Sequence, residues 1–172
     1  MKELILLRHA KSSWDDPALG DFERPLAPRG RRAAPLMGRE IARRGWQPDR
    51  VLVSAARRAR QTWRLVAGEL GLESEAAAYD EALYMASADR LLAAVRKTPE
   101  AAARLLLVGH NPGLEALAAG LAGPGSDEAA LDGMGRKFPT AALAHFTFDG
   151  AWADLGFGGA CLSHFLKPKD FS

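Results

Sequence analysis

The sequence predicts an α/β fold in which helices cover both faces of a mainly parallel sheet, a three-layer α/β/α arrangement. Three short apolar runs, residues 4–7, 51–53 and 105–108, are the basis of this prediction. Each run suits a strand buried on both faces and is too short for a helix, as is typical of parallel sheets. With 172 residues, of which 48% are hydrophobic, the chain is expected to form one domain, residues 1–172, with a complete core.

The first half of the chain alternates strand, loop and helix. Residues 12–29 follow the first apolar run, contain several prolines and acidic residues, and are predicted to form a loop. Residues 31–44 carry apolar side chains at helical spacing. Because a proline inside a helix costs about 3 kcal/mol, either the regular helix begins near Ala33 or it is kinked at Pro35. A second helix is predicted over residues 56–70.

The second half begins with a short strand predicted at residues 76–79 and a helix at residues 88–97. The third apolar run then leads into a helix that is predicted to start near Pro112, because proline suits a first helical position. Such a helix directs its free backbone N–H groups and the positive end of its dipole towards His110. Anions commonly bind at that place.

The C-terminal part is predicted to contain one loop and two strands. Residues 123–139 are rich in glycine and include two prolines, which favours a loop with at most one helical turn. Residues 140–148 and 152–166 are predicted to be strands joined at a turn formed by residues 149–150.

Cysteine content and hydropathy indicate the cellular compartment in which the protein is expected. Cys161 is the only cysteine, so the chain forms no internal disulfide. We find neither a signal peptide nor an apolar run of membrane-spanning length, and we therefore expect a cytoplasmic protein without membrane partners.

Charge is distributed unevenly along the chain. Residues 1–64 hold 15 Lys and Arg against 7 Asp and Glu, a net charge of +8, whereas the remainder carries −6. Many of these arginines are expected on solvated helix faces, but the excess also suits an anionic ligand. Nucleic acid is not expected as a partner, because no nucleic-acid signature or interleaving of aromatic and basic residues accompanies the excess.

Polar residues follow the predicted strands directly. Arg8 and His9 follow the first strand, Arg58 lies soon after the second, and His110 follows the third. Open α/β sheets bind ligands at the carboxyl ends of their strands, so these side chains are expected to meet there. Two arginines can hold phosphoryl oxygens, one histidine can attack phosphorus, and the other can donate to a phosphoryl oxygen. A metal held by the two histidines is the less favoured alternative, because adjacent cations oppose it.

Four segments together resemble a known family. They are Leu6–Ala10, Pro25–Gly30, Ser54–Thr62 and Val108–Pro112. The first contains Arg-His followed by alanine, and the third has the pattern Ser-x-x-x-Arg-Ala-x-Gln-Thr. In this order they resemble the boxes of the histidine phosphatase superfamily, and most closely its small SixA-type phosphohistidine phosphatases. The resemblance implies a phosphoglycerate mutase-like fold.

The resemblance also implies roles for individual residues. His9 would be the nucleophile that is transiently phosphorylated, and Arg8, Arg58 and His110 would form the phosphate pocket. Glu81 is the position chosen for the general acid of the family. Asp80, or the absence of any such acid, remains open.

Two further residues are candidates for substrate binding, and several others are expected to be structural. Ser12 and Asn111 are candidates for contacts with phosphate. Five other residues are expected to have structural roles only. Arg57 and Arg60 are expected as charges on a helix surface, His145 and His164 as strand residues, and Trp63 as a core residue.

The resemblance implies a phosphomonoesterase that works through a phosphohistidine intermediate, without a metal or cofactor. The expected substrate is phosphohistidine on a protein, because the chain lacks the long insertions that cover the site in relatives acting on small metabolites. Two alternatives are a small-molecule phosphatase acting on a phosphomonoester and a non-catalytic module that binds a phospho-ligand. The physiological substrate and the oligomeric state do not follow from the sequence.

Overall fold

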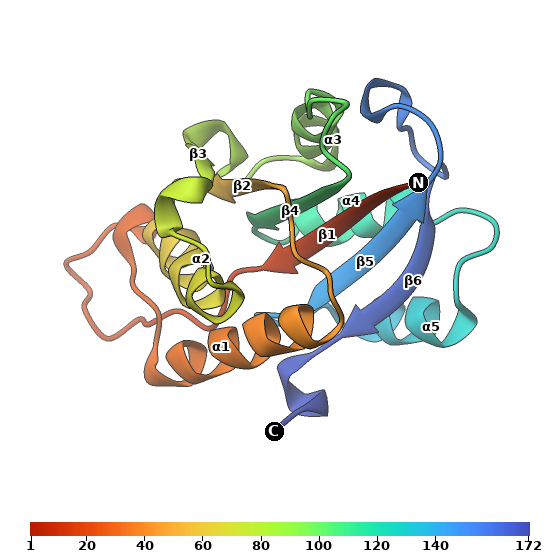
Figure 1. Cartoon of the computed structure of the whole chain (residues 1–172). Helices are drawn as coiled ribbons and strands as arrows, with labels where there is room; N and C mark the ends of the chain where they lie inside the picture. Colours follow the sequence, from red (N-terminus) through yellow and green to blue (C-terminus); the bar gives the residue numbers. More distant parts are fainter.

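A six-stranded sheet lies between two layers of helices in the computed structural model, which describes residues 1–172 (Figure 1). The strands are β1 Lys2–Arg8, β2 Arg50–Ser54, β3 Ala78–Asp80, β4 Arg104–Gly109, β5 Leu143–Phe148 and β6 Cys161–Leu166. The helices are α1 Pro28–Arg43, α2 Arg57–Leu70, α3 Ala88–Arg96, α4 Gly113–Leu121 and α5 Glu128–Arg136. The predicted three-layer α/β fold is confirmed.

The order of strands across the sheet is β3-β2-β4-β1-β5-β6. Pairing is parallel between β1 and β4, β2 and β4, and β2 and β3. It is antiparallel between β1 and β5 and between β5 and β6, so β5 alone runs against the others. The carboxyl ends of β1, β2 and β4 therefore meet at one edge of the sheet.

Alternation of side chains along β1 divides the core into two halves. Leu4 and Leu6 point into the half that is shared with α3, α4 and α5. Ile5 and Leu7 point into the opposite half, which α1 and α2 cover. All four residues are fully buried. Burial on both faces explains why the strand has a continuous apolar run instead of an alternating pattern.

The bounds of α1 decide whether the helix starts near Ala33, one of the two alternatives that Pro35 left open. The helix begins at Pro28, a favourable first position, and continues through Pro35. A start near Ala33 is therefore wrong. Pro35 lies in the helix interior, where it has no N–H to donate to the carbonyl one turn earlier. Burial of Met37 and Ile41 against the sheet compensates for this loss.

The expected loop at residues 123–139 is wrong in one part, because it contains the nine-residue helix α5. The Asp127 side chain caps this helix by accepting the N–H of Ala130 at 2.9 Å. Ala130 and Met134 are buried against the core. Capping and burial together override the low helix propensity of its glycines.

The expected tight turn at residues 149–150 is also wrong. The strand β6 begins only at Cys161, and a longer connection precedes it. Trp152 anchors this connection, since it is fully buried and its indole N–H donates to the carbonyl of Ala102 at 2.8 Å. In the sequence this large apolar residue is typical of a strand, but in the structure it anchors a loop.

The helices of this structure are all too short or too polar to cross a membrane.

Candidate active site

A pocket of about 250 Å³ opens at the carboxyl ends of β1, β2 and β4. Its walls include six residues that the sequence predicted for the site: Arg8, His9, Ser12, Arg58, His110 and Asn111. These residues come from three segments of the chain, which lie at or after the ends of β1, β2 and β4, and the parallel order of the strands brings the segments together.

His9 is held in one tautomer. Its Nδ1 lies 2.7 Å from the carbonyl oxygen of Ala10, which can only accept, so Nδ1 carries the proton. The lone pair of Nε2 is then free to attack an electrophile. Burial lowers the pKa of His9 to about 3, the Ala10 carbonyl opposes this shift, and the cationic neighbours Arg58 and Arg8 add to it. His9 is therefore neutral and nucleophilic at neutral pH.

The loop that carries His9 is tied to helices α1 and α2. The Thr62 hydroxyl accepts the N–H of Ala10 at 2.9 Å and donates to the carbonyl of Arg58 at 2.7 Å. Gly30 lies so close to this loop that an added Cβ would be 2.2 Å from the carbonyl oxygen of Lys11. The loop after β1 thus has little freedom to move relative to either helix.

His110 is the second histidine of the pocket, with its ring 5.1 Å from that of His9. Its Nε2 lies 2.7 Å from the Ser54 hydroxyl, which also accepts the N–H of Ala56. If the Ser54 hydroxyl donates to Nε2, both groups are satisfied and Nδ1 carries the proton. Burial, followed by the charge of Arg58, lowers the pKa of His110 to about 4. A neutral His110 can then donate one hydrogen bond from Nδ1.

Five buried side-chain polar atoms of the structure lack a hydrogen-bond partner, and three of them belong to residues that line this pocket. These three are Nε of Arg8, Nε of Arg58 and Nδ1 of His110. A buried donor without a partner costs about 1–3 kcal/mol, so structures retain few of them without a ligand or a function. Three donors on the walls of one pocket are suited to an anion with several oxygens.

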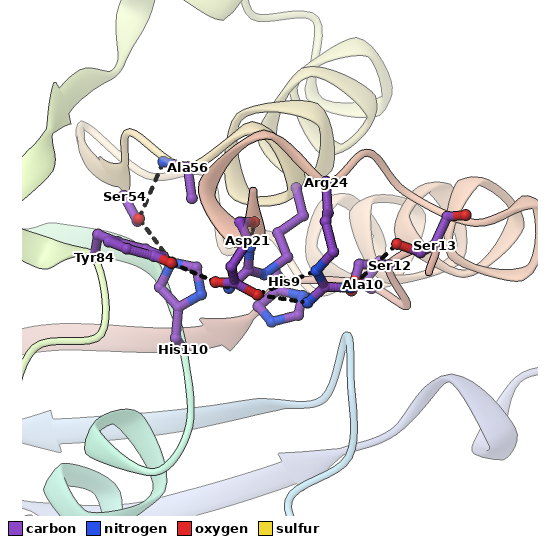
Figure 2. A network of polar contacts seen from close by, with 11 residues as sticks. His9, Ala10, Ser12, Ser13, Asp21, Arg24, Ser54, Ala56, Tyr84 and His110 are labelled. Carbon is purple, nitrogen blue, oxygen red and sulfur yellow. Dashed lines mark hydrogen bonds and ion pairs between the residues drawn. The ribbon is translucent and has the colours of Figure 1, made fainter. Parts of the chain in front are cut away.

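Asp21 is the carboxylate of the pocket, and sequence reasoning missed it. Arg58 donates to the Asp21 carbonyl at 2.7 Å and to its carboxylate at 3.0 Å. Arg24 donates to the same carboxylate at 3.1 Å, and the Tyr84 hydroxyl also donates to it (Figure 2). The hydrogen bond from Tyr84, followed by the arginine charges, lowers the pKa of Asp21 to about 2. Asp21 is therefore ionised and has no proton to donate at neutral pH.

Arg24 extends this network towards Ser12. Its Nη1 donates to the Ser12 hydroxyl at 2.8 Å and to the Ser13 carbonyl at 3.2 Å. The indole ring of Trp14 covers the guanidinium, with 3.4 Å between the carbon Cζ and the ring centroid. Because its hydroxyl accepts from Arg24, Ser12 can still donate its own proton into the pocket.

Comparison with known proteins identifies the family. The model of the histidine phosphatase superfamily (branch 1) matches residues 4–84. The proposed phosphohistidine phosphatase SixA of Nakamurella multipartitia is 34% identical, with a TM-score of 0.81 over 97% of this chain and 96% of its own. The chain belongs to the histidine phosphatase superfamily. It is accordingly a phosphatase, and it is of the SixA type.

Two further relatives of this histidine phosphatase cover nearly the whole chain. The protein histidine phosphatase SixA, solved with tungstate, is 27% identical, with a TM-score of 0.80 over 99% of each chain. An uncharacterized protein of Mycobacterium tuberculosis is 38% identical over 164 residues, which are 95% of this chain and 100% of the relative.

Neither of the acids that the sequence offered as a general acid lines the pocket of this histidine phosphatase. Asp80 ends β3 and accepts the N–H of Ala82 at 2.8 Å. Glu81 is exposed and lines a separate cavity beside α2. The carboxylate that the fold brings to His9 and Arg58 is Asp21 instead.

Asn111 reaches the pocket wall, but its amide is largely engaged in holding the fold. Its Nδ2 donates to the Phe138 carbonyl at 3.0 Å, and its Oδ1 accepts the N–H of Glu115 at 3.2 Å in the first turn of α4. Phe138 also accepts a hydrogen bond from Arg8 at 3.0 Å. Asn111 therefore links the start of α4 to the segment that positions Arg8.

The structure does not bring three His, Cys, Asp or Glu side chains together as a metal site. His145 and His164 lie in β5 and β6, as expected for strand residues, and His145 stacks on Trp46 with 4.0 Å between ring centroids.

Proposed function

We propose that this chain is a phosphohistidine protein phosphatase that works through a phosphorylated His9. One observation supports this proposal above the others: three side chains that line the pocket beside the free Nε2 of His9, namely Arg8, Arg58 and His110, each carry a buried donor without a partner. A phosphoryl group offers three equatorial oxygens to such donors and a phosphorus atom to the nucleophile. A SixA relative was solved in complex with tungstate, a tetrahedral oxyanion like phosphate, which agrees with the proposal that this chain binds a phosphoryl group.

In the first step, Nε2 of His9 attacks phosphorus in line, and the bond between phosphorus and the substrate nitrogen breaks. Charge on the equatorial oxygens is stabilised by Arg8 and Arg58 and by the hydrogen bond from His110. The substrate imidazole departs as a neutral ring when its other nitrogen carries a proton. Since histidine has a reference pKa of about 6.5, this departure requires little acid catalysis at neutral pH.

In the second step, water attacks the phosphorus of phosphohistidine 9. The bond between phosphorus and Nε2 breaks, the water proton passes to solvent or to the phosphate, and inorganic phosphate leaves with His9 regenerated. The same donors serve both steps, because both pass through a similar arrangement of phosphoryl oxygens.

Asp21 acts in this mechanism as a positioning residue. Two hydrogen bonds to Asp21 fix Nη1 and Nη2 of Arg58, which leaves the Nε–H free to donate to phosphate. An acid whose pKa lies at about 2 cannot protonate a leaving group at neutral pH. A phosphatase that acts on phosphohistidine does not require that proton, which agrees with a pocket that has no protonated acid.

The proposal is tested by comparing a phosphohistidine peptide with p-nitrophenyl phosphate as substrates of the wild-type chain and of His9→Ala. We expect release of phosphate from both substrates by the wild type and from neither by the variant. Binding of vanadate without turnover of either substrate would instead indicate a non-catalytic phospho-ligand module. Turnover of p-nitrophenyl phosphate alone would indicate a small-molecule phosphatase.

A further inference from the structure

A second cavity, of about 450 Å³, adjoins the phosphate pocket and is lined by cations. Lysine and arginine side chains from four separate segments contribute to its wall, and no aspartate or glutamate does: Lys11, Arg29, Arg32, Lys137, Lys167 and Lys169. We call this cavity the cationic cleft. In Figure 1 the C-terminal segment that carries two of the lysines lies beside α1, which carries the two arginines.

The six cations of the cleft have no carboxylate partners. None of them takes part in any of the ion pairs of the structure. Arg39 and Arg43 of α1 pair with Glu69 and Glu40. The helix has three further arginines, which form no ion pair, and two of these three line the cleft.

The position of Arg29 and Arg32 is electrostatically unfavourable for the isolated fold. Both lie near the start of α1, which has no acidic residue in its first turn. The helix dipole places positive charge at this end, so cations here are destabilising while anions are favoured. A cluster of like charges that repel one another and oppose the helix dipole indicates selection for an anionic ligand.

The cationic cleft is directly adjacent to the phosphate pocket. Lys11 and Thr140 line both cavities, and Lys11 follows His9 by two residues. A substrate whose phosphoryl group lies at His9 can therefore extend directly into the cleft. The cleft has no aromatic side chain on its wall, so it lacks the stacking surface that single-stranded nucleic acids use.

From this arrangement we infer that the cationic cleft binds an acidic polypeptide segment adjacent to the phosphorylated residue of the substrate protein. This inference rests on the proposed function, because it names the substrate class of the same site. A single additional phosphate would engage one or two cations, whereas an extended acidic segment can engage cations from all four segments. Exposed charges at a binding rim mainly determine selectivity and association rate, and their effect decreases with salt.

The test uses two phosphohistidine peptides that are identical except that Asp and Glu near the phosphohistidine are replaced by Asn and Gln in one of them. In the wild type we expect kcat/KM for the acidic peptide to exceed that for the neutral peptide by about tenfold at low salt. In the variant Arg29→Gln/Arg32→Gln/Lys169→Gln this ratio should fall to about one, with hydrolysis of p-nitrophenyl phosphate unchanged. The matched control Arg50→Gln/Arg90→Gln/Lys97→Gln removes the same charge from another cavity, beside β3 and α3, and should keep the ratio.

A second measurement separates the cleft from the chemistry. A fluorescein-labelled acidic peptide without phosphate should bind the wild type and the control variant about tenfold more tightly than the cleft variant. If this peptide binds as expected but no phosphopeptide is hydrolysed, the proposed function fails and the cleft stands. Equal kcat/KM for both phosphopeptides, or binding of pyrophosphate but not of the acidic peptide to the cleft, would overturn the inference while leaving the proposed function intact.

Discussion

At the scale of single residues, the hydrogen bond from His9 to the Ala10 carbonyl determines what the site can do. It fixes the proton on Nδ1 and leaves Nε2 as the nucleophilic atom. Burial keeps the ring neutral, because a protonated ring would lose its hydration, and the nearby charges of Arg58 and Arg8 add to this effect. The same hydrogen bond and the same burial therefore orient His9 and keep it in its reactive form.

The first prediction concerns pH and follows from the pKa of His9, about 3, and of His110, about 4. An unfolded histidine takes up a proton near pH 6.5. Between pH 6.5 and 4 the unfolded state therefore binds more protons, and the free energy of unfolding decreases as pH is lowered, by up to about 1.4 kcal/mol per pH unit for each histidine. Urea unfolding at several pH values should show a smaller decrease for His9→Gln than for the wild type. Equal slopes, or a His9 NMR titration near 6.5, would contradict it.

The second prediction concerns Asp21. Replacement by Asn keeps the backbone acceptor for Arg58 but removes the carboxylate that orients its Nη2. We expect kcat for p-nitrophenyl phosphate to fall about tenfold, because Arg58 is less well positioned. Inhibition by vanadate should become tighter, because a negative charge has been removed next to a dianion. Steady-state kinetics separate the two effects, and a parallel loss of both would indicate a purely structural role.

The third prediction concerns Glu81, which the sequence offered as general acid. Since Glu81 lines a cavity other than that of His9, Glu81→Gln should leave hydrolysis of phosphohistidine and of alkyl phosphates within about twofold of the wild type. An acid that protonates an alkoxide contributes about 10²–10⁴-fold. A loss of that size, confined to alkyl phosphates, would establish Glu81 as the acid after all. Parallel assays on the two substrate types decide between these outcomes.

At the scale of secondary-structure elements, the segment Ser54–Thr62 joins β2 to α2 and is hydrogen-bonded to the loop after β1, to the following 12–29 loop and to the residue after β4. Ser54 contacts His110, and Arg58 contacts Asp21. The side chain of Gln61 accepts the N–H of Leu26, and Thr62 accepts that of Ala10. The residue types of this segment thus reflect a set of hydrogen bonds that align the loops around the pocket.

The fourth prediction concerns Thr62, which is fully buried. Thr62→Val keeps the shape of the side chain but leaves the Ala10 N–H without its acceptor. We expect the free energy of unfolding to decrease by about 1–3 kcal/mol, the cost of a buried donor without a partner. Activity should also fall, because the loop that carries His9 loses its link to α2. Thr62→Ser retains the hydroxyl and is the control; urea unfolding that does not separate Val from Ser would contradict the prediction.

At the scale of the whole molecule, the layers of the fold and six of the twelve residues that line the pocket could be predicted from the sequence. Continuous apolar runs reveal strands buried on both faces, and a sheet edge gathers whatever follows such strands, as it does for Arg8, His9 and His110. Asp21 could not be placed, because it lies in the 12–29 loop and reaches Arg58 only through tertiary folding. The helix α5 was missed for a related reason, since burial rather than propensity stabilises it.

The cationic cleft could not be predicted from the sequence either, because it also depends on tertiary folding. The sequence reveals the positive charge of the first half of the chain. It does not reveal that Lys137, Lys167 and Lys169 from the other half join Arg29 and Arg32 in one cavity. The position of the C-terminal segment beside α1 brings Lys167 and Lys169 next to the two arginines.

Phosphorylation of His9 during turnover can be measured directly. The enzyme is mixed rapidly with a phosphohistidine peptide, quenched in alkali, in which phosphohistidine is stable, and digested for mass spectrometry at alkaline pH. We expect an increase of one phosphoryl group on the peptide that contains His9, formed and lost at rates compatible with kcat, and none in His9→Ala. A phosphoryl group on any other residue, or near-normal turnover by His9→Ala, would contradict the mechanism.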